Sequence, residues 1–318
     1  MTGTKNHSTP PEERSTEDPR IVSGHAIASD GVELYWRAVG EGPWIACCNG
    51  VGVSTFFWKY VVANFSDRYT VIVWDYRGHG RSQRDLDPLT TDMSIERHAN
   101  DFTAVLHSVG EAIGFDGPQP ALVVGHSMGC QVALELRRRA PRLTQGLVLM
   151  LGTAGKSLTT FFDWSHSPKI FNLAHRMLFQ AGPRANDVIR PLLESPIAFS
   201  FATQFELVDP YYTASEDFIP YLEHLATLDF RLFIENVCQT NEHDAWDLLP
   251  DLDRPLLVIA AENDKFTPMW CSEKIAQDTP GAELMVLAGA SHAALIEQPD
   301  TINHRLERFI RERMSVSW

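Results

Sequence analysis

Cysteine chemistry has little place in this sequence. Its five cysteines, an odd number, show no C-x-x-C spacing, which argues against a disulfide framework and against a zinc knuckle. No cluster of metal-ligating residues is evident either, so we expect no bound metal. Proteins without disulfides are typical of a reducing compartment, and we expect a cytoplasmic location.

Basic residues are few relative to acidic ones. The 27 Lys and Arg residues against 41 Asp and Glu residues give a net charge of −14. Because nucleic acid and anionic membrane surfaces would repel such a chain, we expect neither of them as a partner. A small, neutral or apolar molecule is a better candidate ligand.

The N-terminal segment lacks an apolar core. Residues 1–20 are rich in Ser, Thr, Pro and charged residues, so they match neither a signal peptide nor a membrane span. We expect residues 1–20 to be a disordered leader, and we expect no stable membrane insertion of the protein.

Two glycine-containing stretches lack residues that a nucleotide site requires. Residues 152–157 end like a phosphate-binding loop, but Met150 stands where that motif has its first glycine. Residues 50–52 begin like a dinucleotide fingerprint, but Thr55 replaces its last glycine. Neither stretch supports nucleotide binding, and we expect no cofactor.

Short apolar runs alternate with helix-like segments along most of the chain. A hairpin is expected over residues 21–39, around the turn dipeptide Asp30-Gly31. Buried strands are expected at residues 44–48, 69–74, 121–124, 147–151, 255–261 and 284–287. Helices are expected at residues 56–65, capped by Ser54 or Thr55, at 94–109, capped by Ser94, after residue 127 and at 269–277, with a closing helical region at 293–313. This alternation predicts the α/β class, with a doubly wound, mostly parallel sheet flanked by helices.

Residues 153–246 break that alternation. They lack short apolar strand runs and concentrate aromatic residues on helix-like segments. We expect an inserted helical cap over residues 153–246 and a core formed by residues 21–152 and 247–318. Most of the aromatic residues would form the interior of the cap, and a minority would line a substrate channel.

The motif G-x-S-x-G stands at residues 125–129, between a predicted strand and a predicted helix. Ser127 would lie on the turn, where the flanking glycines remove Cβ atoms that would clash. A serine hydroxyl is a weak nucleophile until a base takes its proton, and that base works best when an acid orients it. The backbone N–H of Met128 would lie at a helix N-terminus, which favours developing negative charge.

An acid and a histidine follow later strands. Glu262 and Asp264 come after the strand that ends at residue 261, and His292 comes after the strand that ends at residue 287. The order serine, acid, histidine is the one expected of α/β-hydrolases. We prefer Asp264 as the acid, because a residue directly at a strand end, such as Glu262, more often faces packing or a solvent pair.

With these motifs the sequence resembles the α/β-hydrolase fold family over about residues 21–152 and 250–314. The likeness rests on the segments 75–82, 125–129, 264–268 and 291–292. It implies that Ser127 is the nucleophile, that His292 is the base and that Asp264 is its orienting acid.

The resemblance also implies an oxyanion hole. The family's loop after the third strand commonly reads His-Gly-x, and the matching residues here are Asn49, Gly50 and Val51. The backbone N–H groups of Val51 and Met128 would be the two donors. Gly50 and His126 are expected to line the substrate site. The other histidines, including His79, His98 and His243, are expected to be ordinary loop or core groups.

We therefore expect a serine hydrolase that cleaves a carboxylic ester or a related acyl bond of a small, largely apolar molecule through an acyl-enzyme. Three alternatives stay open on the same triad or fold: carbon–carbon bond hydrolysis, cofactor-free perhydrolysis and a ligand-binding receptor. The sequence does not determine the exact substrate or the oligomeric state.

Overall fold

The computed structural model describes residues 20–195 and 215–314, together with Ala198 and Ser200. The expected leader, apart from Arg20, lies outside the described residues. So do five aromatic residues of the expected cap, namely Phe199, Phe201, Phe205, Tyr211 and Tyr212.

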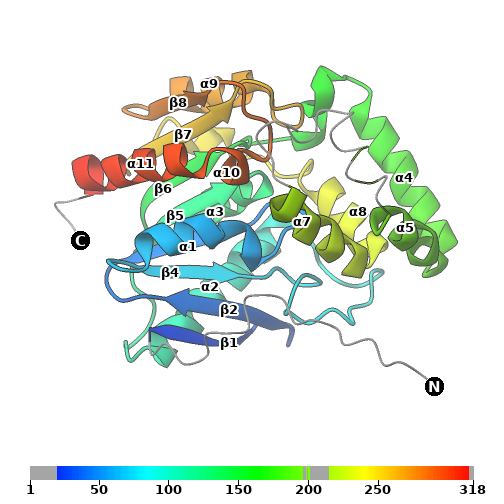
Figure 1. Cartoon of the computed structure of the whole chain (residues 1–318), viewed down its shortest axis with the longest axis horizontal. Helices are drawn as coiled ribbons and strands as arrows, with labels where there is room; N and C mark the ends of the chain where they lie inside the picture. The colour runs from blue at the N-terminus through cyan, green and yellow to red at the C-terminus, as the bar shows by residue number, and fades with distance from the viewer. Residues whose placement is uncertain (1–19, 196–197, 199, 201–214, 315–318) are drawn as a thin grey trace.

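An eight-stranded sheet lies at the centre of the described chain, in the order β1-β2-β4-β3-β5-β6-β7-β8 (Figure 1). The predicted hairpin is confirmed, since β1 (Ile21–Ile27) pairs antiparallel with β2 (Glu33–Val39). Strand β2 also pairs antiparallel with β4, and all later pairs are parallel. The remaining strands are β3 (Trp44–Cys48), β4 (Thr70–Trp74), β5 (Ala121–His126), β6 (Thr144–Met150), β7 (Leu256–Ala261) and β8 (Glu283–Leu287).

The central strands are continuous apolar runs because both faces of the sheet are covered. Every residue of β3, β4, β5 and β7 is buried. Helices α2 (Ile95–Ala112), α3 (Met128–Arg139) and α9 (Met269–Asp278) contribute to the hydrophobic cluster on one face. Helices α1 (Lys59–Phe65), α10 (Ala294–Glu297) and α11 (Pro299–Phe309) contribute to the cluster on the other. The predicted doubly wound α/β class is confirmed.

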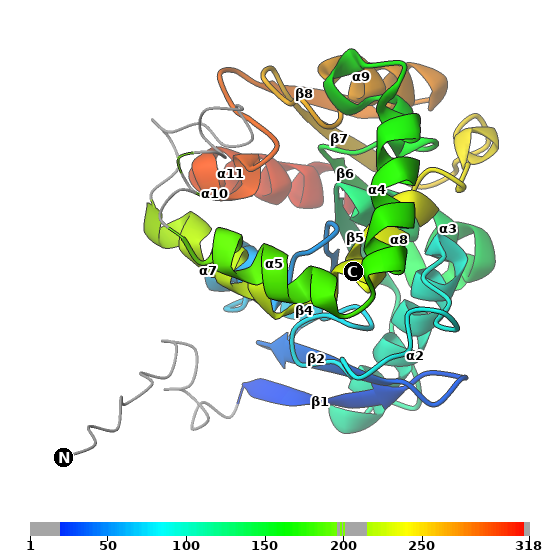
Figure 2. The same ribbon diagram turned by 90° about the vertical axis from the view of Figure 1, so that its right-hand side faces the viewer.

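In the part of the chain that the structure describes, four α-helices lie between β6 and β7: α4 (Ser167–Ala181), α5 (Arg184–Leu193), α7 (Ser215–Thr227) and α8 (Phe230–Gln239). They gather at one side of the molecule, with α4 and α5 outermost (Figure 2). Helix α4 packs on α8, and α5 packs on α7. The short 3-10 helices among the described residues are Thr55–Trp58, Pro141–Leu143, Ser157–Thr159, Phe161–Asp163 and Trp246–Leu248. We call residues 153–246 the insertion.

The expected cap of the helix after β3 needs correction. Neither Ser54 nor Thr55 caps the helix that follows, because the Ser54 hydroxyl donates to Asp75 at 2.6 Å and the same carboxylate oxygen accepts from the Thr55 N–H at 3.0 Å. The closing helical region expected at residues 293–313 is confirmed, and it consists of α10, α11 and a π-helix, Ile310–Met314. Pro299, which lacks a backbone N–H, begins the new helix α11. The predicted Ser94 cap is confirmed, since its hydroxyl accepts from the Arg97 N–H at 3.2 Å.

Candidate active site

Ser127 occupies the sharp turn between β5 and α3. Its backbone has φ 55° and ψ −121°, a left-handed conformation that is strained for serine. The flanking glycines are required by close packing: a Cβ atom at Gly125 would overlap the carbonyl of Gly129, and one at Gly129 would overlap the carbonyl of Cys48. The turn therefore holds the Ser127 side chain at the end of the central strand.

The three side chains predicted as a triad lie in a hydrogen-bonded row. The Nε2 atom of His292 is 3.0 Å from Ser127 Oγ, and its Nδ1 atom is 2.8 Å from Asp264 Oδ2. These residues follow β5, β7 and β8, which lie with β6 in the same half of the sheet. Parallel strands bring their carboxyl ends to the same edge, so residues far apart in sequence meet there.

Further contacts hold the Asp264 carboxylate in place. Its Oδ1 atom accepts from the backbone N–H groups of Phe266 at 2.8 Å and Thr267 at 2.9 Å, and the Thr267 hydroxyl donates to Oδ2 at 2.9 Å. These three hydrogen bonds fix the orientation of the carboxylate toward the His292 ring. Glu262, the alternative acid, is exposed and accepts from the Gly289 N–H at 3.0 Å instead.

The loop of residues 49–52, predicted to carry an oxyanion donor, is anchored by Asn49. This buried side chain donates to the carbonyl of Trp74 at 2.7 Å and accepts from the Trp58 indole at 2.6 Å. The carbonyl of Asn49 accepts from the Tyr76 hydroxyl at 2.9 Å. An amide side chain suits this position because it serves as donor and acceptor at once.

Both predicted oxyanion donors border the same space as Ser127. Met128 is the first residue of α3, so its backbone N–H has no intrahelical acceptor. The N–H of Val51 makes no backbone hydrogen bond within the described part of the chain. Val51, Met128 and Ser127 all line one cavity.

That cavity has a volume of about 250 Å³. Of the predicted site residues, Gly50, Val51, His126, Ser127, Met128 and His292 line it. Among the described residues around it there is no Asp, Glu, Lys or Arg. Seven Phe and Tyr side chains contribute to its walls: Phe57, Phe161, Phe171, Phe218, Tyr221, Phe233 and Phe266.

The insertion supplies five of these aromatic side chains, and two come from the core. Within the insertion, Phe161, Phe171 and Tyr221 line the cavity, whereas Phe162 and Trp164 are exposed. Sequence reasoning missed the core residues Phe57 and Phe266. A signal for Phe266 was available, since it lies two residues after Asp264.

His126 contacts both His292, the predicted base, and Phe57 in the cavity wall. Its ring is buried, and its Nε2–H donates to the carbonyl of His292 at 3.0 Å. It also packs on the rings of Phe57 and His292, with centroid distances of 4.8 and 5.1 Å. Burial lowers the pKa of His126 to about 3, so the ring is neutral near pH 7.

Across residues 20–195 and 215–314, no group of three or more His, Cys, Asp and Glu residues is arranged to hold a metal ion. No helix in those ranges combines the length and the apolar character that crossing a bilayer requires. All five cysteines are free thiols.

Comparison with known proteins shows the family that the chain matches. The model of the alpha/beta hydrolase family matches residues 45–305. A protein of Agrobacterium fabrum named "Putative carbamate hydrolase RutD" is 25% identical over 283 residues, covering 87% of this chain and 97% of that protein. A protein of the same name from Pseudomonas savastanoi pv. phaseolicola is 27% identical over 278 residues, with the same two coverages.

Solved structures share the fold. An enol-lactonase from Burkholderia xenovorans superposes with a TM-score of 0.70 at 22% identity, covering 91% of this chain and 100% of that one. A thermophilic esterase from Thermogutta terrifontis gives a TM-score of 0.70 at 21% identity, covering 92% and 98%.

Proposed function

This chain belongs to the alpha/beta hydrolase family, and from that premise we propose that it is a serine hydrolase that cleaves a carboxylic ester or a related acyl bond of a small, largely apolar substrate. The observation that carries the proposal is the row Ser127, His292 and Asp264, with separations of 3.0 and 2.8 Å. A hydroxyl, a base and a buried acid in that order are the parts that acyl transfer needs.

The reaction begins when His292 Nε2 takes the proton of the Ser127 hydroxyl as Oγ attacks the substrate carbonyl. The carbonyl oxygen becomes negatively charged and accepts hydrogen bonds from the N–H groups of Val51 and Met128. Asp264 stays ionised and stabilises the histidinium. The tetrahedral intermediate collapses as His292 gives its proton to the leaving group, and the acyl-enzyme forms.

Hydrolysis of the acyl-enzyme follows the same route with water. His292 takes a proton from water, the resulting hydroxide attacks the acyl carbon, and the proton passes to Ser127 Oγ as the acid product leaves. The walls of Phe and Tyr exclude bulk water, which strengthens the hydrogen bonds to the oxyanion.

The cavity supports an uncharged substrate. No lysine, arginine or carboxylate lines it among the described residues, so a charged group inside would lack a partner. A volume of about 250 Å³ suits a compact acyl group. The names of three similar proteins assign them a carbamate, a lactone and an ester as substrates. All three kinds of substrate react at an acyl carbon, and we count a carbamate among the related acyl compounds.

A panel of aryl esters of graded acyl length, together with an aryl carbamate, tests the proposal. We expect turnover of at least one member by the native protein and none above background by Ser127→Ala. A fluorophosphonate probe should label Ser127 alone. Saturable binding of every member without product would instead indicate a receptor, and labelling of another serine would relocate the site.

A further inference from the structure

His79, which the sequence suggested was an ordinary loop or core group, contacts the loop that carries Val51. It is buried in the loop after β4. Its Nδ1 atom is 2.9 Å from the carbonyl of Arg77, and the backbone N–H of Gly52 donates to its Nε2 atom at 3.3 Å. Because a carbonyl only accepts and an amide N–H only donates, the ring must carry its proton on Nδ1.

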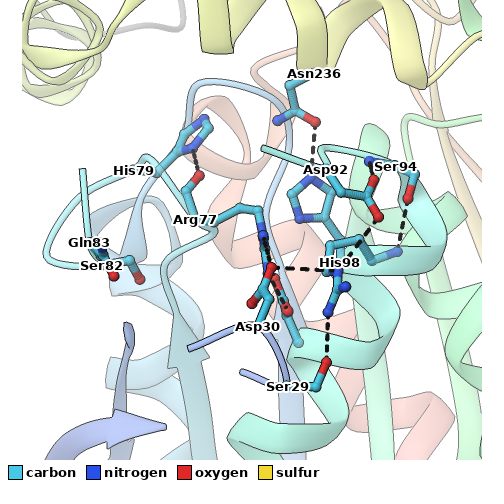
Figure 3. Close-up of polar contacts among 12 residues, drawn as sticks. Ser29, Asp30, Arg77, His79, Ser82, Gln83, Asp92, Ser94, His98 and Asn236 are labelled. Atoms are coloured by element: carbon cyan, nitrogen blue, oxygen red, sulfur yellow. Dashed lines mark hydrogen bonds and ion pairs between the residues drawn. The ribbon is translucent and has the colours of Figure 1, made fainter. Parts of the chain in front are cut away.

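The Arg77 end of this link is rigid. Its buried guanidinium pairs with Asp101 at 2.7 Å and with Asp30 at 2.8 Å. Figure 3 shows the Arg77 side chain running down to Asp30 while its carbonyl faces the ring of His79. Charge-assisted pairs of this kind fix the residue whose backbone orients His79.

The Gly52 end of the link is held from the opposite side by the insertion. Gly52 has φ +71°, and a Cβ atom there would lie 2.7 Å from Leu225 Cδ2 and 2.9 Å from Phe233 Cε2. Leu225 belongs to α7 and Phe233 to α8. Asn49 anchors the other end of the 49–52 loop, so Val51 lies between two fixed points.

We infer that His79 is a positioning residue for the reaction: by accepting from Gly52 it holds the 49–52 loop so that the Val51 N–H faces the developing oxyanion. This inference rests on the proposed function, which assigns Val51 as an oxyanion donor. His79 itself touches neither substrate nor reacting atoms.

The hydrogen bond from the Gly52 N–H requires a neutral His79 ring, and the surroundings of the ring favour its neutral form. Burial lowers the pKa of His79 to about 4. Its other close neighbours are the rings of Tyr76 and His224, with centroid distances of 6.2 and 6.0 Å. A proton on Nε2 would face the Gly52 N–H and break the hydrogen bond.

His98 offers a matched control in the same region. It is also a buried histidine whose pKa is lowered, to about 3, and its Nε2 atom is 3.0 Å from Asn236 Oδ1 of α8 (Figure 3). Its hydrogen bond joins α2 to α8 instead of reaching the 49–52 loop. Replacing His98 therefore reports the cost of losing a buried histidine without loss of the Gly52 contact.

Three variants test the inference by ester kinetics. His79→Leu removes the acceptor, and we expect kcat to fall about tenfold or more while KM changes less than about threefold, because an oxyanion donor acts mainly in the transition state. His79→Gln keeps an acceptor oxygen and should recover much of kcat. His98→Leu should lower Tm yet keep kcat within about twofold. His79→Met, also without a strong acceptor, replaces His79→Leu if that variant does not fold.

A boronic acid that forms a tetrahedral adduct on Ser127 should bind about tenfold more weakly to His79→Leu. Amide hydrogen exchange in the peptide containing residues 49–52 should also quicken in His79→Leu and not in His98→Leu. The inference would be overturned if a folded His79→Leu variant kept the native kcat, boronate affinity and exchange rate. It would also be overturned if His98→Leu showed losses equal to those of His79→Leu. The exchange readout needs no turnover: if the native protein cleaves no ester, the proposed function fails on its own evidence.

Discussion

At the residue scale, Ser127 combines a strained backbone with a hydroxyl 3.0 Å from His292 Nε2. Ser127→Ala removes the hydroxyl and keeps the small side chain that the turn accepts. We expect turnover to fall by about three orders of magnitude or more with little change in Tm, because nucleophile and base act as a unit. Initial rates with an aryl ester and thermal unfolding measure the two effects. Near-native turnover would contradict the role of Ser127.

The two candidate acids differ in burial and in partners. Asp264 is buried and lies 2.8 Å from His292 Nδ1, whereas Glu262 is exposed and bound to the Gly289 N–H. Asp264→Asn should lower kcat by about three orders of magnitude, since the tautomer and charge of His292 lose their support. Glu262→Gln is the matched control and should change kcat less than about threefold. The reverse result would assign the acid to Glu262.

At the scale of elements, Asp75 joins the end of β4 to the helices that follow β3. Its carboxylate accepts from the Ser54 hydroxyl, the Thr55 N–H and the Arg81 N–H, at 2.6, 3.0 and 2.9 Å. Asp75→Ala would leave these donors without that partner, and we expect the free energy of unfolding to fall by about 3 kcal/mol. Ser54→Ala should cost about 1 kcal/mol. Urea unfolding measures both, and equal costs would contradict a central role for the carboxylate.

Helix α4 presents Phe171 to the cavity, while the nearby Phe162 is exposed. Phe171→Ala should enlarge the acyl site and raise the kcat/KM ratio of longer to shorter acyl esters about tenfold. Phe162→Ala should leave the ratio unchanged. This comparison tests whether the insertion selects the substrate, as we propose for a cap over residues 153–246. An unchanged ratio in both variants would place selectivity in the core.

Elements of the core could be predicted from the sequence because parallel strands covered on both faces are short, unbroken apolar runs. The positions of Ser127, Asp264 and His292 followed from the same pattern, since each comes after such a run. The partner of Ser54 could not be predicted, because Asp75 comes from a later strand. The packing of Phe233 against Gly52 could not be predicted either, because it depends on how α8 packs on the core.

At the scale of the whole molecule, four histidines whose pKa values are lowered couple folding to pH. Burial lowers the pKa of His79 to about 4 and those of His98, His126 and His224 to about 3. In the unfolded chain a histidine has a pKa of about 6.5, so below that pH the unfolded state binds more protons than the folded state. The stability from these neutral rings is therefore complete above about pH 6.5 and is lost as pH falls toward 4.

We expect the free energy of unfolding to decrease between pH 6.5 and 5, with a limiting slope of about 1.4 kcal/mol per pH unit for each histidine. Urea unfolding at several pH values measures the slope. His98→Leu should reduce the slope by up to about 1.4 kcal/mol per pH unit, the contribution of one histidine. A free energy of unfolding that is constant between pH 7 and 5 would show that these rings take up protons as readily in the folded protein as in the unfolded chain.

The order of the strands has a consequence for the growing chain during synthesis. Strand β6 pairs with β7, which is made only after the whole insertion has been synthesised. Until then, the hydrogen-bonding edge of a buried apolar strand is open, and such edges invite pairing with other chains. His292 is also 165 positions from Ser127. A nascent chain therefore carries its nucleophile long before its base, so an unfinished polypeptide is inert toward esters at the stage when it most readily aggregates.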